Sequence, residues 1–206
     1  MTFMPNPLAS TTRLPRLFRL GALAPRAAFL VSKFVEADLA VVQRISAVAA
    51  RSPEWRMFAV TISKLGNGAI YPLLAAVVFA AWGWDGGKRM ILLAAVNAAI
   101  MHILYPLIKR RFKRLRPFKV DPRLPSLLDT LDEHSFPSGH AMTLTGVLAP
   151  VVLLWPAAAV SAVVMACCMA WSRVATGHHY PSDVAAGVAL GVGLGYALSV
   201  NLLALI

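Results

Sequence analysis

Long apolar stretches separated by short polar segments dominate the chain from about residue 57 onward. Crossing a bilayer as a helix takes about 20 mostly apolar residues, and Met90–Ile108 alone offers nineteen residues without a formal charge. Five stretches have this character: Met57–Trp84, Met90–Ile108, His140–Trp155, Ala157–Trp171 and Val184–Ile206. The pattern therefore predicts an all-α fold, a polytopic membrane helix bundle.

The segment 27–50 also reads as helical, but it carries Lys33, Glu36, Asp38 and Arg44. Each charge at the centre of a bilayer costs about 2.5–3.5 kcal/mol. We therefore predict a polar N-terminal helix that lies in the membrane interface, with a first crossing as the alternative. The bundle then has five or six transmembrane helices, in one membrane domain over 27–206, preceded by a basic tail over 1–26.

Two polar loops interrupt the apolar pattern, at about 109–139 and 172–183. Two predicted crossings lie between them, so both loops should face the same side of the membrane. The turn at Trp84–Lys88 and the C-terminus should lie on the opposite side. In the last stretch, Gly187, Gly191 and Gly195 are spaced four apart, a pattern that favours close helix packing.

Composition supports this interpretation and adds a charge asymmetry. The chain of 206 residues is 58% hydrophobic and only 14% charged, against roughly 45–50% and 25% in soluble domains. Its net charge is +11, and nineteen of its twenty Lys and Arg residues lie at or before Arg123. No soluble basic domain carries this charge, so anionic lipids or phosphorylated substrates are expected as partners and nucleic acid is not.

The first polar loop contains two features that suit a phosphate. Seven basic residues fall within the eleven positions from Lys109 to Lys119, which taken alone describe a solvated surface that attracts anions. The loop ends in Pro137-Ser138-Gly139-His140, directly before an apolar helix. A helix beginning there presents free backbone N–H groups to an anion.

The second polar loop holds the only formal charges after His134, namely Arg173 and Asp183. Charges within so much apolar sequence are usually functional. His179 and Asp183 are four apart, so they share a face if the segment is helical. A carboxylate beside one imidazole nitrogen makes the other nitrogen a better nucleophile, and the fork of Arg173 matches two phosphate oxygens.

Three motifs together resemble the signature of the phosphatidic acid phosphatase type 2 superfamily. They are Lys109-x6-Arg116-Pro117, then Pro137-Ser138-Gly139-His140, then Ser172-Arg173-x5-His179-x3-Asp183. Their order and internal spacing match, and the resemblance covers the chain from about residue 57 to the end. The superfamily includes membrane lipid phosphatases and undecaprenyl diphosphatases.

The resemblance implies a role for each residue of the motifs. His179 would attack phosphorus and become a phosphohistidine, Asp183 would orient it, and His140 would protonate the leaving oxygen and then activate water. Phosphate would be bound by Lys109, Arg116, Ser138, Gly139 and Arg173. These fixed cations would replace a metal, so neither a metal nor a cofactor is expected.

The function implied is an integral-membrane hydrolase of lipid phosphates or diphosphates, undecaprenyl diphosphate among them. Phosphatidylglycerophosphate, phosphatidic acid and lipid A remain alternative substrates, and a lipid phosphotransferase or a transporter remain alternative functions. The resemblance places the site on the periplasmic or outer face of a bacterial cell membrane, whereas the basic loop by itself favours the cytoplasm. The interpretation leaves the oligomeric state open. It takes Arg114 as a cation that attracts head groups, and His178 as a wall of the pocket.

Overall fold

A computed structural model describes residues 25–130 and 132–205, and within them the chain is almost entirely helical. The basic tail expected over 1–26 falls outside these residues except for its last two positions. The helices are α1 (Pro25–Arg51), α2 (Pro53–Lys64), α3 (Ile70–Phe112), α4 (Pro117–Val120), α5 (Gly139–Leu154), α6 (Ala159–Ala175) and α7 (Pro181–Leu203). A π-helical turn, η1 (Leu65–Ala69), joins α2 to α3, and a 3₁₀ turn, η2 (Pro156–Ala158), precedes α6.

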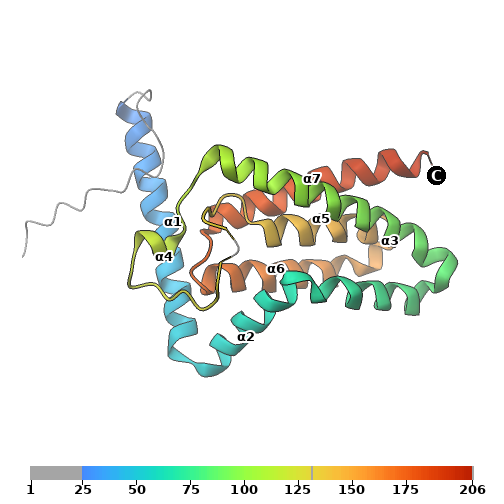
Figure 1. Ribbon diagram of the computed structural model, residues 1–206, viewed down its shortest axis with the longest axis horizontal. Helices are drawn as coiled ribbons and strands as arrows, with labels where there is room; N and C mark the ends of the chain where they lie inside the picture. The colour runs from blue at the N-terminus through green and yellow to red at the C-terminus, as the bar shows by residue number, and fades with distance from the viewer. Residues whose placement is uncertain (1–24, 131, 206) are drawn as a thin grey trace, which may run out of the picture.

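The α3 helix is bent back on itself and forms two arms of the bundle (Figure 1). The bend lies at Gly83, whose φ of 64° is in the left-handed region that glycine tolerates. The arms lie alongside α5, α6 and α7, and the bend is at the end of the bundle far from α1 (Figure 1). The turn predicted at Trp84–Lys88 is therefore confirmed, one residue after the break in helical geometry.

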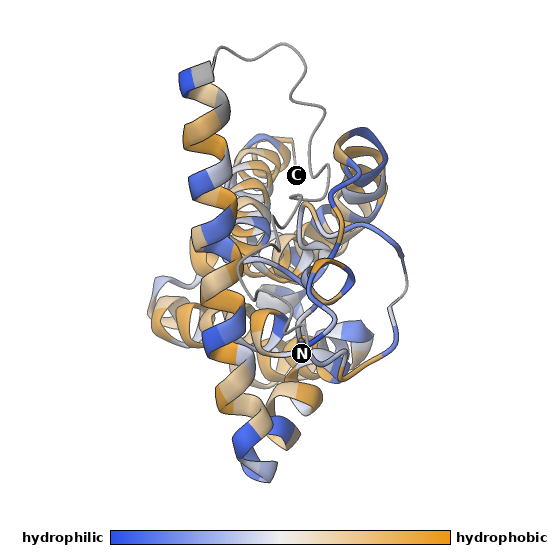
Figure 2. Cartoon of the chain, turned by 90° about the vertical axis from the view of Figure 1, so that its left-hand side faces the viewer, coloured by the Kyte–Doolittle hydropathy of each residue, from blue (hydrophilic) through white to orange (hydrophobic). Residues whose placement is uncertain are grey.

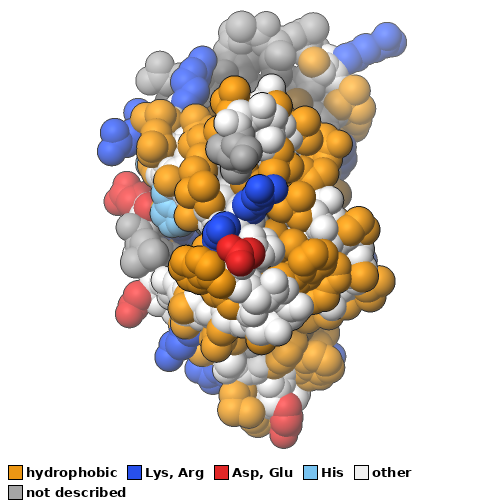
Figure 3. Space-filling view, turned by 90° about the vertical axis from the view of Figure 1, so that its right-hand side faces the viewer, with side chains coloured by type: hydrophobic (Ala, Val, Ile, Leu, Met, Phe, Trp, Pro, Cys, Tyr) orange, Lys and Arg blue, Asp and Glu red, His pale blue; other side chains and the backbone are white. Residues whose placement is uncertain are grey.

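The predicted apolar stretches all coincide with helices. Three helical stretches are long and apolar enough to cross a membrane, namely Pro53–Phe112, Pro156–Ala175 and Pro181–Leu203, and α5 is a shorter apolar helix. Large apolar side chains remain exposed on α3, α6 and α7, among them Ile103, Val160, Val163 and Tyr196. Figure 3 shows that the end opposite α1 is also covered mainly by hydrophobic side chains, with few charged ones. The chain is an integral membrane protein, as its sequence predicts.

The first helix runs across one end of the bundle, at a steep angle to the other helices (Figure 1). Figure 2 shows polar and apolar residues alternating along it, in front of helices that are seen nearly end-on. Val42 and Asp38 are buried against the bundle, while Phe29 and Phe34 are 60% and 58% exposed. The charges that argue against a membrane crossing are thus divided between solvent and one buried carboxylate.

Both polar loops lie at the end of the bundle that α1 crosses, and the C-terminus lies at the other end (Figure 1). This is the arrangement that two intervening crossings predict. The basic end of α3, the start of α5 and the α6–α7 junction are thereby brought together. Residues more than sixty positions apart in sequence can therefore form one site.

The glycines of α7 form a contact with α5, as their spacing predicts. A Cβ added at Gly187 would lie 2.6 Å from the Ser138 carbonyl oxygen. A Cβ added at Gly195 would lie 2.9 Å from the Gly146 backbone. Asn97 of α3 ties the same helices together by donating to the carbonyl oxygens of Gly146 and Gly195, at 2.9 and 3.0 Å. Three of the four helices that adjoin the polar loops, α3, α5 and α7, are therefore held in close register.

Replacing Gly191 with alanine should destabilise the protein. The added methyl group would collide with the Met142 carbonyl oxygen and the Thr145 hydroxyl on α5, and overpacking of this kind costs about 1–3 kcal/mol. We expect a lower melting temperature in detergent. Gly193→Ala is the matched control, because nothing lies within 4 Å of its new methyl group on the same helix. Equal melting temperatures for the two variants would contradict the close packing of α5 on α7.

Candidate active site

A cavity of about 450 Å³ opens where the two polar loops meet the ends of the helices. Six of the eight predicted site residues line it: Lys109, Arg116, Gly139, His140, Arg173 and His179. They come from the last turn of α3, the loop before α4, the start of α5, the last turn of α6 and the α6–α7 junction. The three motifs therefore form a single site.

The three predicted phosphate-binding cations are all buried, with Lys109 and Arg173 each 5% exposed and Arg116 2% exposed. Two of them hold the carboxylate of Asp132, with Lys109 Nζ 2.7 Å from Oδ2 and Arg116 2.8 Å from Oδ1. Burial alone would raise the pKa of Asp132, but the hydrogen bonds and charges of Lys109 and Arg116 outweigh it and lower that pKa. A phosphate that binds both cations must therefore compete with this carboxylate.

The imidazole of His179 is 1% exposed and points its two nitrogens at groups of opposite charge. A guanidinium N–H of Arg116 lies 3.4 Å from Nε2. Since a guanidinium can only donate, Nε2 is the unprotonated nitrogen and Nδ1 carries the proton. Burial, together with the charges of Arg173 and Arg116, holds the pKa of His179 well below its ordinary value. The ring is therefore neutral, with its lone pair directed into the cation cluster.

Asp183 lies behind His179, outside the cavity lining and fully buried. Its Oδ2 is 3.7 Å from Nδ1, and this nitrogen has no hydrogen-bond partner among the described residues. Oδ2 instead accepts the Tyr180 backbone N–H at 2.9 Å. At this distance the two groups are close but not hydrogen-bonded. A small movement of the His179 ring would bring them within hydrogen-bond distance.

His179 and Asp183 would share a helix face only if the segment were helical, and this condition is not met, because α7 begins only at Pro181. The chain leaves α6 through Gly177, whose φ is 74°, and the His179 N–H bonds the Arg173 carbonyl oxygen at 3.1 Å. A Cβ at Gly177 would also collide with the Pro125 carbonyl oxygen. The end of one helix and the start of the next, not a shared helix, bring the two side chains together.

His140 sits in the first turn of α5 and bonds a residue from a distant helix. Its Nε2 is 2.8 Å from Asn67 Oδ1, and an amide oxygen accepts, so Nε2 donates and Nδ1 is left unprotonated in the neutral ring. A Cβ at Gly66 would come within 2.7 Å of the His140 ring. The Gly66-Asn67-Gly68 break in the first apolar stretch thus has a role in the site that its sequence alone does not indicate.

The start of α5 supplies backbone groups to the cavity. Gly139 lines the wall, and the first N–H groups of a helix have no intrahelical acceptor. Ser138 caps α5 but is not on the cavity wall; its buried hydroxyl has no partner within the described chain. Its backbone N–H bonds the Asp183 carbonyl oxygen at 3.0 Å. Phosphate binding by Ser138 and Gly139 therefore remains a prediction, and of the two only Gly139 lies on the cavity wall.

The neighbouring His178 holds Arg173 in position. Its Nε2 donates to the Leu128 carbonyl oxygen at 3.0 Å, and its Nδ1 accepts from the Arg173 guanidinium at 3.1 Å. Burial and the positive charges of Arg173 and Arg116 lower the pKa of His178 to about 3, so it stays neutral. His178 therefore supports Arg173 from just behind the cavity and does not itself line the predicted wall.

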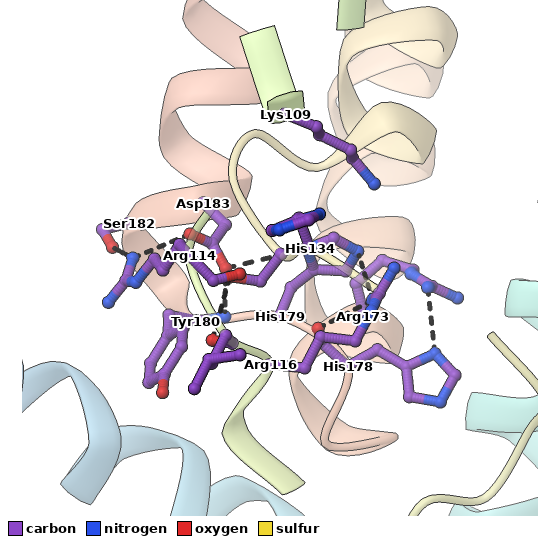
Figure 4. Close-up of polar contacts among 12 residues, drawn as sticks. Lys109, Arg114, Arg116, His134, Arg173, His178, His179, Tyr180, Ser182 and Asp183 are labelled. Atoms are coloured by element: carbon purple, nitrogen blue, oxygen red, sulfur yellow. Dashed lines mark hydrogen bonds and ion pairs between the residues drawn. The ribbon is translucent and has the colours of Figure 1, made fainter. Parts of the chain in front are cut away.

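Arg114 is the clearest correction to the sequence interpretation. It is 3% exposed and so does not reach lipid head groups. Its guanidinium instead lies 2.7 Å from Asp183 Oδ1 (Figure 4). It also lies 2.7 Å from Asp38 Oδ2 of α1. No spacing rule points to this pair, because Asp38 and Arg114 are separated by 76 positions. The only signal in the sequence was Asp38 itself, a carboxylate in an amphipathic helix that the structure shows to be buried.

Known proteins resemble this chain over the region that contains most of the cavity residues. The family model of the PAP2 superfamily matches residues 87–204. The chain is 39% identical over 118 residues to a decaprenylphosphoryl-5-phosphoribose phosphatase of Mycobacterium tuberculosis, which covers 52% of this chain and 59% of that protein. It is 30% identical over 125 residues to an Escherichia coli protein provisionally named an undecaprenyl-diphosphatase, which covers 60% of this chain and 62% of the relative.

A solved structure shares the fold. It is a transmembrane PAP2-type phosphatidylglycerolphosphate phosphatase from Bacillus subtilis, with a TM-score of 0.63 and 24% identity over 87% of this chain and 90% of that one. The chain spans about three fifths of the length of each of the two curated relatives. The family match, in contrast, extends over more than half of this chain and includes all three motifs. The chain belongs to the PAP2 superfamily.

Proposed function

We propose that this protein hydrolyses a lipid phosphate or diphosphate through a phosphohistidine on His179. The observation that carries the proposal is the setting of this ring. Its unprotonated Nε2 faces a cluster of three buried cations, Lys109, Arg116 and Arg173, that line a cavity. A neutral nucleophile beside preorganised positive charge is what in-line attack on a phosphate dianion requires.

The reaction divides into two steps. In the first, His179 Nε2 bonds to phosphorus, the bond from phosphorus to the leaving oxygen breaks, and the imidazolium form of His140 gives its Nδ1 proton to this oxygen and becomes neutral. In the second, His140 accepts a proton from water, the water oxygen bonds to phosphorus and the phosphorus–nitrogen bond breaks. Lys109, Arg116 and Arg173 stabilise the equatorial oxygens throughout, so no metal is needed for charge compensation.

A lipid substrate fits the position of the cavity. The cavity lies at the ends of apolar helices, and Tyr71 and Tyr105 of α3 form part of its wall. A phosphate could enter while its tail remained in the bilayer. Both curated relatives carry polyprenyl names, which supports a polyprenyl-linked phosphate or diphosphate as the substrate class. In this proposal α1 lies in the interface and the site faces the periplasm.

The test is phosphate release by the purified protein in detergent. The panel is undecaprenyl diphosphate, a polyprenyl-phosphate pentose 5-phosphate, phosphatidylglycerophosphate, phosphatidic acid and lipid A, each with and without a metal chelator. We expect a polyprenyl compound to be hydrolysed fastest, at the same rate in both conditions. No release from any lipid would overturn the proposal, and loss of activity with the chelator would overturn metal independence. Release only when an acceptor alcohol is present would indicate a phosphotransferase.

A further inference from the structure

The site has a second charged layer behind the nucleophile, and this layer begins on the first helix. One guanidinium, that of Arg114, is held between the carboxylates of Asp183 and Asp38. The side chains of all three residues are at most 4% exposed. The guanidinium also lies over the Tyr180 ring, 3.7 Å from its centroid. These three contacts hold the Arg114 guanidinium in one orientation.

Asp38 is a buried carboxylate that is hydrogen-bonded to the start of α7. Its Oδ1 accepts the backbone N–H of Ser182 at 3.1 Å, and Oδ2 also bonds the Ser182 hydroxyl. Ser182 lies in the first turn of α7, one residue before Asp183. Asp38 thus holds the start of α7 through two sets of contacts, hydrogen bonds to Ser182 and an ion pair with Arg114. Both sets of contacts lead to the carboxylate that faces His179.

The charges of this layer do not cancel. Two carboxylates share one guanidinium, so the group behind His179 carries a net charge of −1, whereas the cavity side carries three cations against one carboxylate, Asp132. With Arg114 on Oδ1, the other oxygen of Asp183 is left for the Tyr180 N–H and for His179 Nδ1. If Asp38 were neutral, Arg114 would offset Asp183 fully and the charge facing the ring would be weaker.

The charge that develops in the first step falls on this side of the ring. When Nε2 bonds to phosphorus, the electron pair of the broken bond leaves with the oxygen, and the imidazole keeps its Nδ1 proton and becomes a cation. An anionic group fixed 3.7 Å from Nδ1 stabilises that cation and the transition state leading to it. Preorganisation matters here, because a carboxylate that had to reorient would add to the barrier.

We propose that Asp38 and Arg114 are positioning residues for phosphohistidine formation, so that α1 supplies part of the active site. They touch neither substrate nor the reacting nitrogen. They hold Asp183 in one orientation and keep the layer behind His179 anionic. This inference rests on the proposed function, since it assigns a role in the step that forms the phosphohistidine.

The test uses two variants that alter one property each. Asp38→Asn keeps the shape and removes the charge, and Arg114→Lys keeps the charge and removes the fork. The measured quantity is the rate constant of phosphoenzyme formation in rapid-quench experiments, which does not depend on the folded fraction. We expect a fall of about ten-fold or more in each variant, with little change in KM, a typical effect of losing an outer hydrogen-bonded partner. Asp38→Glu should restore part of the rate.

Glu36→Gln is the matched control, because Glu36 is an exposed carboxylate on the same helix, and among the described residues it pairs only with Lys33. It should form the phosphoenzyme at the wild-type rate. An Asp38→Asn protein with a wild-type rate constant, or with a raised KM and unchanged rate constant, would overturn the inference while leaving the proposed function intact. A wild-type protein that hydrolyses the lipid without forming a phosphohistidine would overturn both. If Asp38→Asn fails to fold, Arg114→Lys decides by the same criterion.

Discussion

Replacing His179 with alanine should reduce phosphate release by at least about 1,000-fold, the scale on which removal of a nucleophile acts in other hydrolases. The cavity and its cations would remain, but no nitrogen would face phosphorus at their centre. The wild-type protein, quenched during turnover of a labelled lipid phosphate, should carry a phosphate stable to base and labile to acid. The variant should carry none.

The control for this experiment is another histidine of the same cavity, one that no proposed step uses. His102 lies on the α3 wall and bonds only the Ala98 carbonyl oxygen of its own helix, among the described residues. No proposed step uses it, so His102→Ala should hydrolyse lipid phosphate near the wild-type rate. Undiminished release by His179→Ala would show that water or another residue attacks phosphorus directly.

Replacing Arg116 with lysine should lower kcat/KM by about 100-fold or more, because the site uses the shape of the guanidinium as well as its charge. Its fork bonds the Asp132 carboxylate and the His178 carbonyl oxygen, and it donates to His179 Nε2. A lysine could reach only part of this set. It would also leave the protonation of Nε2 unspecified. Steady-state kinetics on the preferred lipid measures the effect.

Arg110→Lys provides the comparison, since Arg110 belongs to the same basic run but is exposed. It should retain wild-type kinetics at moderate ionic strength. If the two substitutions proved equally mild, the run would act only as a general field that attracts anions, and Arg116 would have no individual role. If both were equally severe, the distinction between buried and exposed cations would be wrong.

Much of the architecture follows from hydropathy alone. The apolar stretches, the turn near Gly83 and the placement of both polar loops on one side agree with the structure, because a bilayer-length helix imposes its own alternation of sides. The glycine stripe of α7 is equally local, since its spacing defines a face before any partner is known. These features depend on neighbours within a few turns.

The partners of the site residues could not be predicted in the same way. Asn67 meets His140 across 73 positions, and Asp38 meets Arg114 across 76. Asp132 is only 23 positions from Lys109, yet it lies in a polar loop where a carboxylate is ordinarily solvated. Each of these contacts depends on how the helices pack. The sequence alone does not give the distance in space between such residues.

The sequence by itself therefore determined the class of fold and most of the residues that meet at the cavity, because bilayer thickness and motif spacing act through short stretches of chain. The tertiary structure alone decided how those residues are held. It replaced the expected shared helix of His179 and Asp183 with a junction between two helices. It also moved Arg114 from the surface into a buried pair with α1. The physical reason is that a buried charge is stable only beside a partner, and partners are found by packing, not by position in the chain.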